Sequence, residues 1–308
     1  MNRNDYVIGI GAVNVDIFGK SSVPIKIKFD HIANIRTQIG GVTRNILDNL
    51  SALGINTKLL SALGDDLFGE AIINNSKERN IDMSDVLRVE GSSSGIFMQV
   101  MDDNNDMFLA LCDMSVLKKV DIEYLKSHEA VIRQAKAIVF DPSLEPEVIE
   151  YLIDAYKEIP LFLDPVSDDY ALKIKPYVSR LFCVKPNQRE LGVLAEMPTE
   201  TVDDCIKAAK SLIAKGLKSI YVSLGKQGAL YCDKDACLHK KLFEESDVVN
   251  ASGAGDGFFA GAIYGYLNDL GIEKTMDIAL AAGIANIRSE KNINPKLSMD
   301  YINEILKS

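Results

Sequence analysis

The chain has 308 residues, of which 47% are hydrophobic and 25% are charged. A chain of this length buries roughly three quarters of the surface that it exposes when unfolded, which allows one large domain or two modest ones. The net charge of −10, from 34 basic and 44 acidic residues, excludes nucleic acid as an expected partner because its phosphates would be repelled. The sequence has no apolar run of about 18 residues and no apolar leader, so we expect a cytoplasmic protein without a membrane partner.

The cysteines predict reduced thiols rather than a disulfide framework, because their number is odd and their positions are scattered. Cys232, Cys237 and His239 stand close together in the sequence. They lie in an alternating strand pattern, however, and lack the spacing of a zinc site. The five cysteines are Cys112, Cys183, Cys205, Cys232 and Cys237.

Short apolar runs alternate along the chain with longer segments of helical period. We expect strands at residues 6–13, 57–63, 136–140, 160–164, 182–184 and 218–224. We expect helices at residues 43–53, 67–79, 121–134, 145–157, 187–195 and 201–215. In the first helix one apolar stripe is followed by Gly54, where a glycine commonly ends a helix. This alternation predicts an α/β fold with a doubly wound, mostly parallel sheet and helices on both faces.

Two segments interrupt the alternation. Residues 95–113 contain two strand-like runs joined by the polar turn from Asp102 to Asp106, which indicates a hairpin. Residues 15–39 are rich in β-branched residues and have no helical period. A small β-sheet that projects from the main fold explains both segments, and an antiparallel extension at the edge of the main sheet explains them equally well.

The segment from Ser252 to Gly257 carries the strongest chemical signal. Its small residues allow the backbone to approach a ligand, and the helical pattern that follows places Gly253 to Asp256 at a helix start. Unpaired amides and the positive end of the helix dipole make such a start a binding site for anions. A carboxylate beside bound phosphate is costly unless it acts as a base or a metal ion offsets its charge. The alternative is a tight glycine turn followed by an ordinary acidic residue.

A second signal is Gly40-Gly41 at the start of the helix expected at residues 43–53. The paired glycines allow close backbone approach, and the Asn45 amide can both donate to and accept from a hydroxyl group. On its own the string is equally compatible with a loop and a solvated asparagine. A Walker A loop is absent, Asn14 replaces the third glycine of a dinucleotide fingerprint, and no nucleophile elbow of a serine hydrolase is present.

Together these two strings resemble the signatures of the ribokinase, or PfkB, family of carbohydrate and nucleoside kinases. They occur in the expected order, and the resemblance covers essentially the whole chain. It implies a single ribokinase-like α/β domain over residues 1–308, with a small β-sheet lid formed by residues 15–39 and 95–113. It also implies transfer of the ATP γ-phosphate to a primary hydroxyl group, with Mg²⁺ as a further cofactor.

The resemblance implies a role for each residue that matches the family's motifs. The catalytic set is the general base Asp256 and an anion hole formed by Gly253, Ala254 and Gly255. The residues expected to bind the acceptor are Asn14, Asp16, Gly40, Gly41 and Asn45. Those expected to bind ATP are Asn187, Ser223, Gly225, Gly228, Ser252 and, near adenine, Asn286. Glu190 is expected to hold Mg²⁺ through water. Asn250 stands where many members have aspartate, in the loop that helps bind a monovalent cation, so dependence on K⁺ is left open.

Four strings look most like those of bacterial pseudouridine kinases: residues 41–45, 112–114, 164–167 and 294–295. They imply that the acceptor is the 5′-hydroxymethyl group of pseudouridine. Arg44 contributes to this resemblance, although it fits a surface helix residue as well. A sugar kinase of ribokinase or fructokinase type and another nucleoside kinase are the alternatives. A non-catalytic binding protein is disfavoured because a binder needs no base such as Asp256.

Two further expectations concern the lid. Ser93, Ser94 and Asp113 are candidates for contact with the nucleoside base by position alone. The exposed edge strands of such a lid favour a homodimer.

Overall fold

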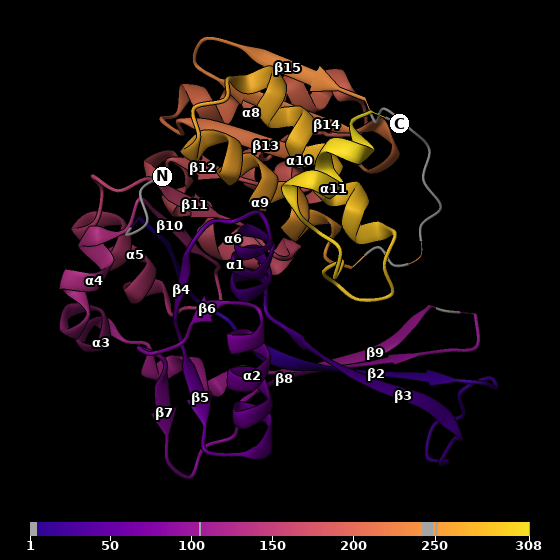
Figure 1. Ribbon diagram of the computed structural model, residues 1–308. Coiled ribbons are helices and arrows are strands. Elements are labelled where there is room, and N and C mark those ends of the chain that lie inside the picture. Colours follow the sequence, from indigo (N-terminus) through magenta and orange to yellow (C-terminus); the bar gives the residue numbers. More distant parts are fainter. Residues whose placement is uncertain (1–4, 105, 242–248, 250–251, 308) are drawn as a thin grey trace.

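The computed structural model describes residues 5–104, 106–241, 249 and 252–307. Its large sheet has the strand order β15-β14-β13-β12-β11-β10-β1-β4-β6 (Figure 1). Pairing is parallel from β6 to β13, and β14 and β15 are added by antiparallel pairing. The prediction of a mostly parallel sheet is therefore confirmed. The strands are β1 (Val7–Ile10), β4 (Thr57–Leu60), β6 (Ile81–Asp82), β10 (Ala137–Phe140), β11 (Leu161–Leu163), β12 (Cys183–Val184), β13 (Ser219–Ser223), β14 (Ala229–Asp233) and β15 (Cys237–Lys240).

Helices cover both faces of this sheet. The helices packed on one face are α1 (Val42–Ala52), α2 (Leu67–Glu78), α9 (Ala254–Leu267) and α10 (Ile272–Ile287), with α11 (Met299–Ile305) against α10. The helices of the other face are α3 (Ile122–Ser127), α4 (Glu129–Gln134), α5 (Pro146–Ala155), α6 (Asp168–Ile174), α7 (Gln188–Ala195) and α8 (Val202–Ala214). Three short 3₁₀ turns are η1 (Ser115–Lys119), η2 (Lys175–Arg180) and η3 (Gly225–Gln227). The helix expected at residues 121–134 is two helices, because the chain turns at His128 between α3 and α4.

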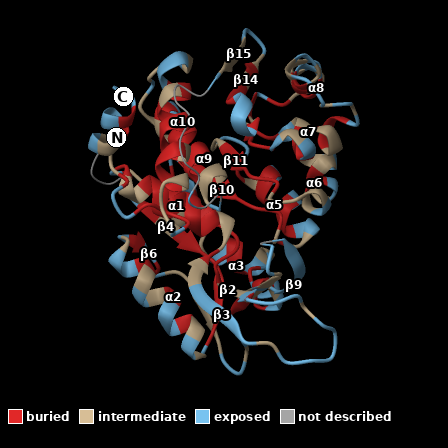
Figure 2. Cartoon of the chain, turned by 90° about the vertical axis from the view of Figure 1, so that its right-hand side faces the viewer, coloured by how far each residue is buried: buried red, intermediate tan, exposed pale blue. Residues whose placement is uncertain are grey.

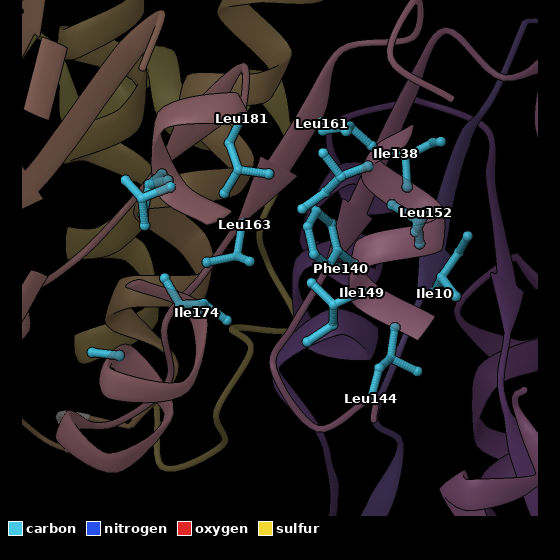
Figure 3. Close-up of a cluster of buried hydrophobic side chains, with 14 of the residues drawn as sticks. Ile10, Ile138, Phe140, Leu144, Ile149, Leu152, Leu161, Leu163, Ile174 and Leu181 are labelled. Carbon is cyan, nitrogen blue, oxygen red and sulfur yellow. The ribbon is translucent and has the colours of Figure 1, made fainter. Parts of the chain in front are cut away.

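The core consists of two apolar layers, one on each face of the large sheet. Successive side chains of a strand point to opposite faces, so Val7 packs with α1 and α9 whereas Ile8 packs with α5. Figure 2 shows that the buried residues gather in this sheet and the helices against it. Figure 3 shows Phe140 of β10 beside Ile149 of α5, within the layer on the α5 face. The strands are thus covered by apolar contacts on both faces. These contacts fix the position of the strands and therefore of their carboxyl ends.

The two segments that interrupt the alternation form a separate sheet with the order β3-β2-β8-β9. Figure 1 shows this small sheet extending away from the body of the protein. It does not extend the large sheet, so that alternative is wrong. Its strands are β2 (Asn14–Ser21), β3 (Ala33–Gly40), β8 (Gly95–Met101) and β9 (Met107–Asp113). A further two-stranded sheet pairs β5 (Ala62–Gly64) with β7 (Leu87–Val89).

The small sheet has two chemically different faces. Its polar face, which lines a hollow of about 430 Å³ together with Ser252, carries Phe18, Lys20, Asn34, Arg36, Gln99 and Met101. The register places Ile17, Ile35, Met98, Leu109 and Leu111 on the opposite, apolar face. Four of these apolar side chains are substantially exposed: Ile35, Met98, Leu109 and Leu111. One face can therefore meet a polar ligand, and the other is suited to burial.

The prediction of reduced thiols is wrong for two of the five cysteines. Cys232 and Cys237 form a disulfide, while Cys112, Cys183 and Cys205 are free. Antiparallel pairing of β14 with β15 places Cys232 directly opposite Cys237, with their Cα atoms 4.1 Å apart. The two cysteines are five residues apart in the sequence, and this spacing alone does not show that they lie opposite each other in a hairpin. In the described part of the chain, no helix is long and apolar enough to cross a bilayer.

Candidate active site

Polar side chains gather at the carboxyl edge of the large sheet, where its parallel strands end. Asp16 lies shortly after β1, Asp141 after β10, Asp164 after β11 and Lys185 after β12. Ligands of open α/β sheets bind at this edge because loops from neighbouring strands meet there. The parallel sheet therefore brings together residues that are far apart in the sequence.

Asp256 lies in the first turn of α9, which begins directly after Gly253. Gly253 has a φ of 79°, and a Cβ atom there would clash with the carbonyl group of Asn292. Glycine is needed for both reasons. The amides of the first turn have no partner within the helix and present their N–H groups at the helix start. The structure thus places Gly253, Ala254, Gly255 and Asp256 where an anion can bind, as the resemblance implied.

The carboxyl group of Asp256 is buried, with the residue 8% exposed. The Asn45 side-chain amide donates a hydrogen bond of 2.9 Å to its Oδ2 atom. Burial and the neighbouring Asp164 raise the pKa of Asp256 to about 7, against the opposing effects of Lys185 and Asn45. A carboxyl group with such a pKa changes its protonation state near neutral pH, which suits a general base.

Lys185 and Asp164 are site residues to which sequence reasoning assigned no role. Lys185 Nζ lies 2.7 Å from Asp164 Oδ2, and both side chains are almost fully buried. Burial alone would lower the pKa of Lys185, but the Asp164 carboxylate and, more weakly, Glu190 and Asp256 raise it. A Cβ atom on Gly255 would lie 2.9 Å from Lys185 Nζ, so the ammonium group borders the start of α9. The pair could not be predicted from the sequence because only the sheet brings β11 next to β12.

Asn187 and Glu190 form a capping box at the start of α7. Asn187 Oδ1 accepts from the Glu190 amide at 2.9 Å, and Glu190 Oε2 accepts from the Asn187 amide at 2.8 Å. Burial and Asp164 raise the pKa of Glu190 to about 7. The Lys185 ammonium group lowers the pKa of Glu190 and also that of Asp256. Lys185 therefore links the expected Mg²⁺ side of the site to Asp256.

Ser223, Gly225 and Gly228 lie at the end of the next strand, β13. A β-bridge pairs Ser223 with Asn187, so these two expected ATP residues are neighbours. Gly228 has a φ of 88°, and a Cβ atom there would clash with the carbonyl group of Lys240. This turn therefore requires glycine.

The expected acceptor site contains Asp16. Asn14 donates to its Oδ1 atom at 2.6 Å, and Asn292 donates to its Oδ2 atom at 3.5 Å. Burial raises the pKa of Asp16 to about 6. A Cβ atom on Gly40 would clash with this carboxyl group, so glycine leaves room for it. Asn292 was not predicted, and its role depends on a late loop folding back over the small sheet.

Gly41 and Asn45 connect this acceptor side to Asp256. Gly41 is the N-terminal cap of α1 with a φ of 97°, and a Cβ atom would clash with the Ala12 carbonyl group. Asn45 follows one turn later and contacts Asp256. Asp16 is close enough to contribute to the raised pKa of Asp256. The structure therefore brings the two sequence signatures together at one site.

The expected contact of Asn286 with adenine is not supported. Its side chain is fully buried, and its Nδ2 atom donates to the Gly253 carbonyl group and to Asn49 Oδ1, both at 2.9 Å. Its Oδ1 atom accepts from the Asn294 amide at 3.0 Å. With its polar atoms engaged inside the protein, Asn286 positions the start of α9 instead.

Arg44 is not a surface residue, which corrects that alternative. The residue is 3% exposed, pairs with Asp48 at 2.8 Å and donates to Asn75 Oδ1 at 2.7 Å. Its Nη1 atom also lies 3.4 Å from Asn45 Oδ1. Arg44 therefore anchors the helix that carries Asn45.

The three positional candidates for base contact, Ser93, Ser94 and Asp113, differ in availability. Ser93 is exposed. Ser94 is buried, and its hydroxyl group bonds to Asp66, the cap of α2, so it is not free to contact a ligand. Asp113 is exposed and accepts from the Ser115 amide at 2.9 Å.

Ser252 lines the hollow under the polar face of the small sheet. Asn250, on which the expectation for K⁺ rests, lies outside the described residues.

A helix start that can bind phosphate, a buried carboxyl group with a raised pKa and a separate group of polar side chains are the features expected of a phosphotransferase with an alcohol acceptor. The family model for pfkB family carbohydrate kinases matches residues 4–298. The chain belongs to this family.

Comparison with individual proteins agrees with this assignment. The pseudouridine kinase of Escherichia coli K12 is 27% identical over 308 residues, covering 100% of this chain and 98% of the relative. A crystal structure of a Clostridium perfringens protein provisionally assigned as a sugar kinase is 32% identical, with a TM-score of 0.88 and coverage of 99% and 96%. An E. coli protein provisionally assigned as ribokinase II, solved with ATP and Mg²⁺, is 17% identical with a TM-score of 0.82 and coverage of 98% and 99%. The last comparison concerns the fold alone.

The raised pKa of Asp256 predicts a pH-dependent gain in stability for Asp256→Asn. A carboxyl group whose pKa is about 7 when folded and about 3.8 when unfolded stabilises the fold while protonated, and this contribution is lost as the pH rises toward 7. The excess unfolding free energy of the variant over the wild type should therefore grow by about 2 kcal/mol between pH 5 and pH 8. Urea unfolding at both pH values measures this difference. Asp169→Asn, at an exposed position, is the control; an excess that is equal at both pH values would contradict the raised pKa.

Proposed function

We propose that the protein phosphorylates the 5′-hydroxymethyl group of a ribosyl substrate, with pseudouridine as its preferred acceptor. The observation that carries the proposal is Asp256, a buried carboxyl group with a pKa near 7 at a helix start, between the acceptor residues and the phosphate side. Asp256 accepts the proton of the attacking hydroxyl group as the new oxygen–phosphorus bond forms and the bond between the γ-phosphorus atom and the bridging oxygen of ATP breaks, which releases ADP. Its Oδ1 atom is the acceptor, because Oδ2 already accepts from Asn45.

ATP and Mg²⁺ fit the residues on the phosphate side. The start of α9 offers unpaired amides, Lys185 offers a buried positive charge, and Gly255 leaves room beside it. Glu190 and Asp164 offer oxygen ligands of the kind that Mg²⁺ binds, directly or through water. ATP supplies the phosphoryl group, and Mg²⁺ offsets its charge. Lys185 and the first-turn amides stabilise the negative charge that develops during transfer.

The acceptor side orients the ribosyl group. Asp16 is held by Asn14 and Asn292, and the alternation of β2 places it on the same face of the small sheet as Phe18 and Lys20, which line the hollow. A carboxylate accepts strong hydrogen bonds from two neighbouring hydroxyl groups. Gly40 and Gly41 allow the sugar to approach the backbone closely. The 5′-hydroxyl group is thereby directed toward Asp256.

Three observations favour pseudouridine over a simple sugar. The E. coli pseudouridine kinase aligns with the whole chain, although at 27% identity. Arg44, which belongs to the string most like that subfamily, is buried and holds the helix of Asn45. The hollow of about 430 Å³ beneath the polar face also has room for a base beyond the ribose. A sugar kinase is the second candidate, favoured by the 32% identical protein of C. perfringens.

The small sheet acts as a lid in this proposal. Its polar face lines the same hollow as Ser252, so closure would exclude water, which competes as a phosphoryl acceptor. Its apolar face carries the exposed Ile35, Met98, Leu109 and Leu111. A contiguous apolar face on a projecting sheet favours a second copy as its cover. We therefore include a homodimer through the lid.

Removal of the base should reduce turnover without a comparable loss of binding. Asp256→Asn should lower kcat by about two to four orders of magnitude and change the Kd of the acceptor only a few fold. Asp16→Ala should weaken acceptor binding by about 30-fold or more and leave ATP binding nearly unchanged. Steady-state kinetics and calorimetry separate the two effects. An Asp256→Asn variant with more than half of the wild-type kcat would show that another group is the base.

Substrate preference tests the identity of the acceptor. Pseudouridine offers an N1–H group that uridine lacks, and a site with an acceptor for that group rejects uridine because the acceptor is left unpaired. We expect kcat/KM for pseudouridine to exceed those for uridine and ribose by at least about tenfold. ADP release with each acceptor measures this ratio. Equal or better turnover of ribose or fructose would assign the protein to the sugar kinases and leave the role of Asp256 intact.

The apolar face of the lid predicts a dimer that charge disrupts. The double variant Leu109→Asp/Leu111→Asp should convert the dimer to a monomer, because two carboxylates would be buried without partners. Size-exclusion chromatography with light scattering measures the mass in solution. Leu172→Asp places the same charge on another exposed leucine and should leave the dimer intact. A monomeric wild type, or a variant that is still dimeric, would refute this interface.

A further inference from the structure

A second cavity lies at the amino edge of the large sheet, opposite the edge that carries Asp256. Its volume is about 390 Å³, within the range of small-molecule sites. It is bordered by the residues that lead into β12 and β13, by the end of β14 and by Tyr266 near the end of α9. No residue of the phosphate or acceptor sites lines it. The cavity is therefore a separate feature of the fold.

Aromatic rings form the walls of this cavity. The five rings are Phe162, Phe182, Tyr221, Tyr231 and Tyr266. Phe182 and Tyr266 have their ring centroids 4.9 Å apart, as do Tyr221 and Tyr231. Tyr266 is 42% exposed although its ring contacts the buried Phe162 and the half-buried Phe182. Such walls suit a flat ring, which gains by stacking and by edge-to-face contact.

Tyr221 provides a polar group without a partner. The residue is 6% exposed, yet its hydroxyl group makes no hydrogen bond to any residue in the described part of the chain. The neighbouring Tyr231 differs, because its hydroxyl group donates to Asp233 Oδ2 at 2.7 Å. Burial raises the pKa of Tyr221, so its hydroxyl proton is retained. The hydroxyl oxygen is still reached by solvent, and because Tyr221 lines the cavity, a ligand there can take the place of water as its hydrogen-bond partner.

The rim of the cavity indicates the charge of the ligand. Asp233 accepts from Tyr231 and from the amides of Asp235 and Ala236, and these bonds hold its pKa below the usual range against the opposing effect of burial. Lys234 is paired with Asp235 at 3.4 Å. The lining carries two lysines, Lys218 and Lys234, against two aspartates, Asp233 and Asp235, so the cavity offers no net positive charge for a phosphate group. The remaining lone pairs of Asp233 suit an N–H donor.

We propose that this aromatic cavity is a second ligand site, which binds an uncharged nucleobase ring, free or in an unphosphorylated nucleoside. The ring lies against Tyr266 and Phe182, its polar edge meets the Tyr221 hydroxyl group, and an N–H group donates to Asp233. A lipid chain would leave the Tyr221 hydroxyl group unpaired. A nucleotide would bring its phosphate next to Asp233. The site is independent of phosphotransfer and would be present in a sugar kinase as well.

Calorimetry with free adenine and free uracil tests the site by binding alone. The titrations use Asp16→Ala saturated with a non-hydrolysable ATP analogue and Mg²⁺, which blocks the phosphate side and weakens sugar binding. A base that binds in the hollow under the small sheet is recognised because changes at Tyr221 and Tyr266 would leave its binding unchanged. At least one of the two bases should bind with a Kd below about 1 mM, and ribose should not bind. In this background, Tyr221→Phe should weaken binding about three- to tenfold, because one hydrogen bond is lost. Tyr266→Leu should weaken it by a similar factor, because a stacking wall is lost.

Tyr301→Phe, on α11, is the matched control and should leave binding unchanged. The proposal is overturned if neither base binds up to about 10 mM. It is equally overturned if ribose binds as well as the bases, or if binding is unchanged in both Tyr221→Phe and Tyr266→Leu. A failed phosphotransfer assay would refute the proposed kinase function and leave this result untouched, because binding is the only readout.

Discussion

The candidate site at the carboxyl edge of the large sheet depends on one buried carboxyl group, that of Asp256. This group is held between opposing electrostatic effects. Burial and the negative charge of Asp164 favour the protonated form, whereas Lys185 and the Asn45 amide favour the ionised form. Their near balance gives a pKa of about 7, which a surface aspartate would not have. Asp256 lies on α9, and its three partners come from α1 and from the ends of β11 and β12. The two sequence signatures thus come together only when α1 and α9 are packed side by side on the sheet.

A network of side-chain amides keeps this geometry in place. Asn286 bonds to the Gly253 carbonyl group and to Asn49, and Asn49 in turn donates to the carbonyl group of Asn45. Apolar contacts are not directional, whereas these hydrogen bonds fix both the rotation of α1 and the position where α9 begins. Because the network is buried and each amide has a partner, loss of one member leaves others unsatisfied. Positioning is therefore distributed over residues that contact no substrate.

Local patterns in the sequence predicted the elements and the residues that act through their own backbone. The glycines at 41 and 253 belong to this group, because a helix start and a positive φ leave a mark on adjacent residues. Partners across the fold left no such mark. The pairing of Lys185 with Asp164 requires the strand order, and the disulfide of Cys232 requires the register of a hairpin. Asn286 was misplaced because family position does not show whether a side chain points outward or inward.

The same difference between local patterns and partners across the fold explains why the sequence identifies the family, whereas the acceptor is a proposal. The groups that identify the family act on a primary hydroxyl group and on phosphates, which all its members handle. In the proposed function the rest of the acceptor lies against the polar face of the small sheet, where Arg36 lies over the ring of Phe18 and Gln99 lies on the neighbouring strand. On a strand these residues are spaced two apart, so substitutions there alter the hollow without disturbing the apolar face. Under the proposed function, substitutions on this sheet can therefore change the choice of substrate while Asp256 and its partners stay the same.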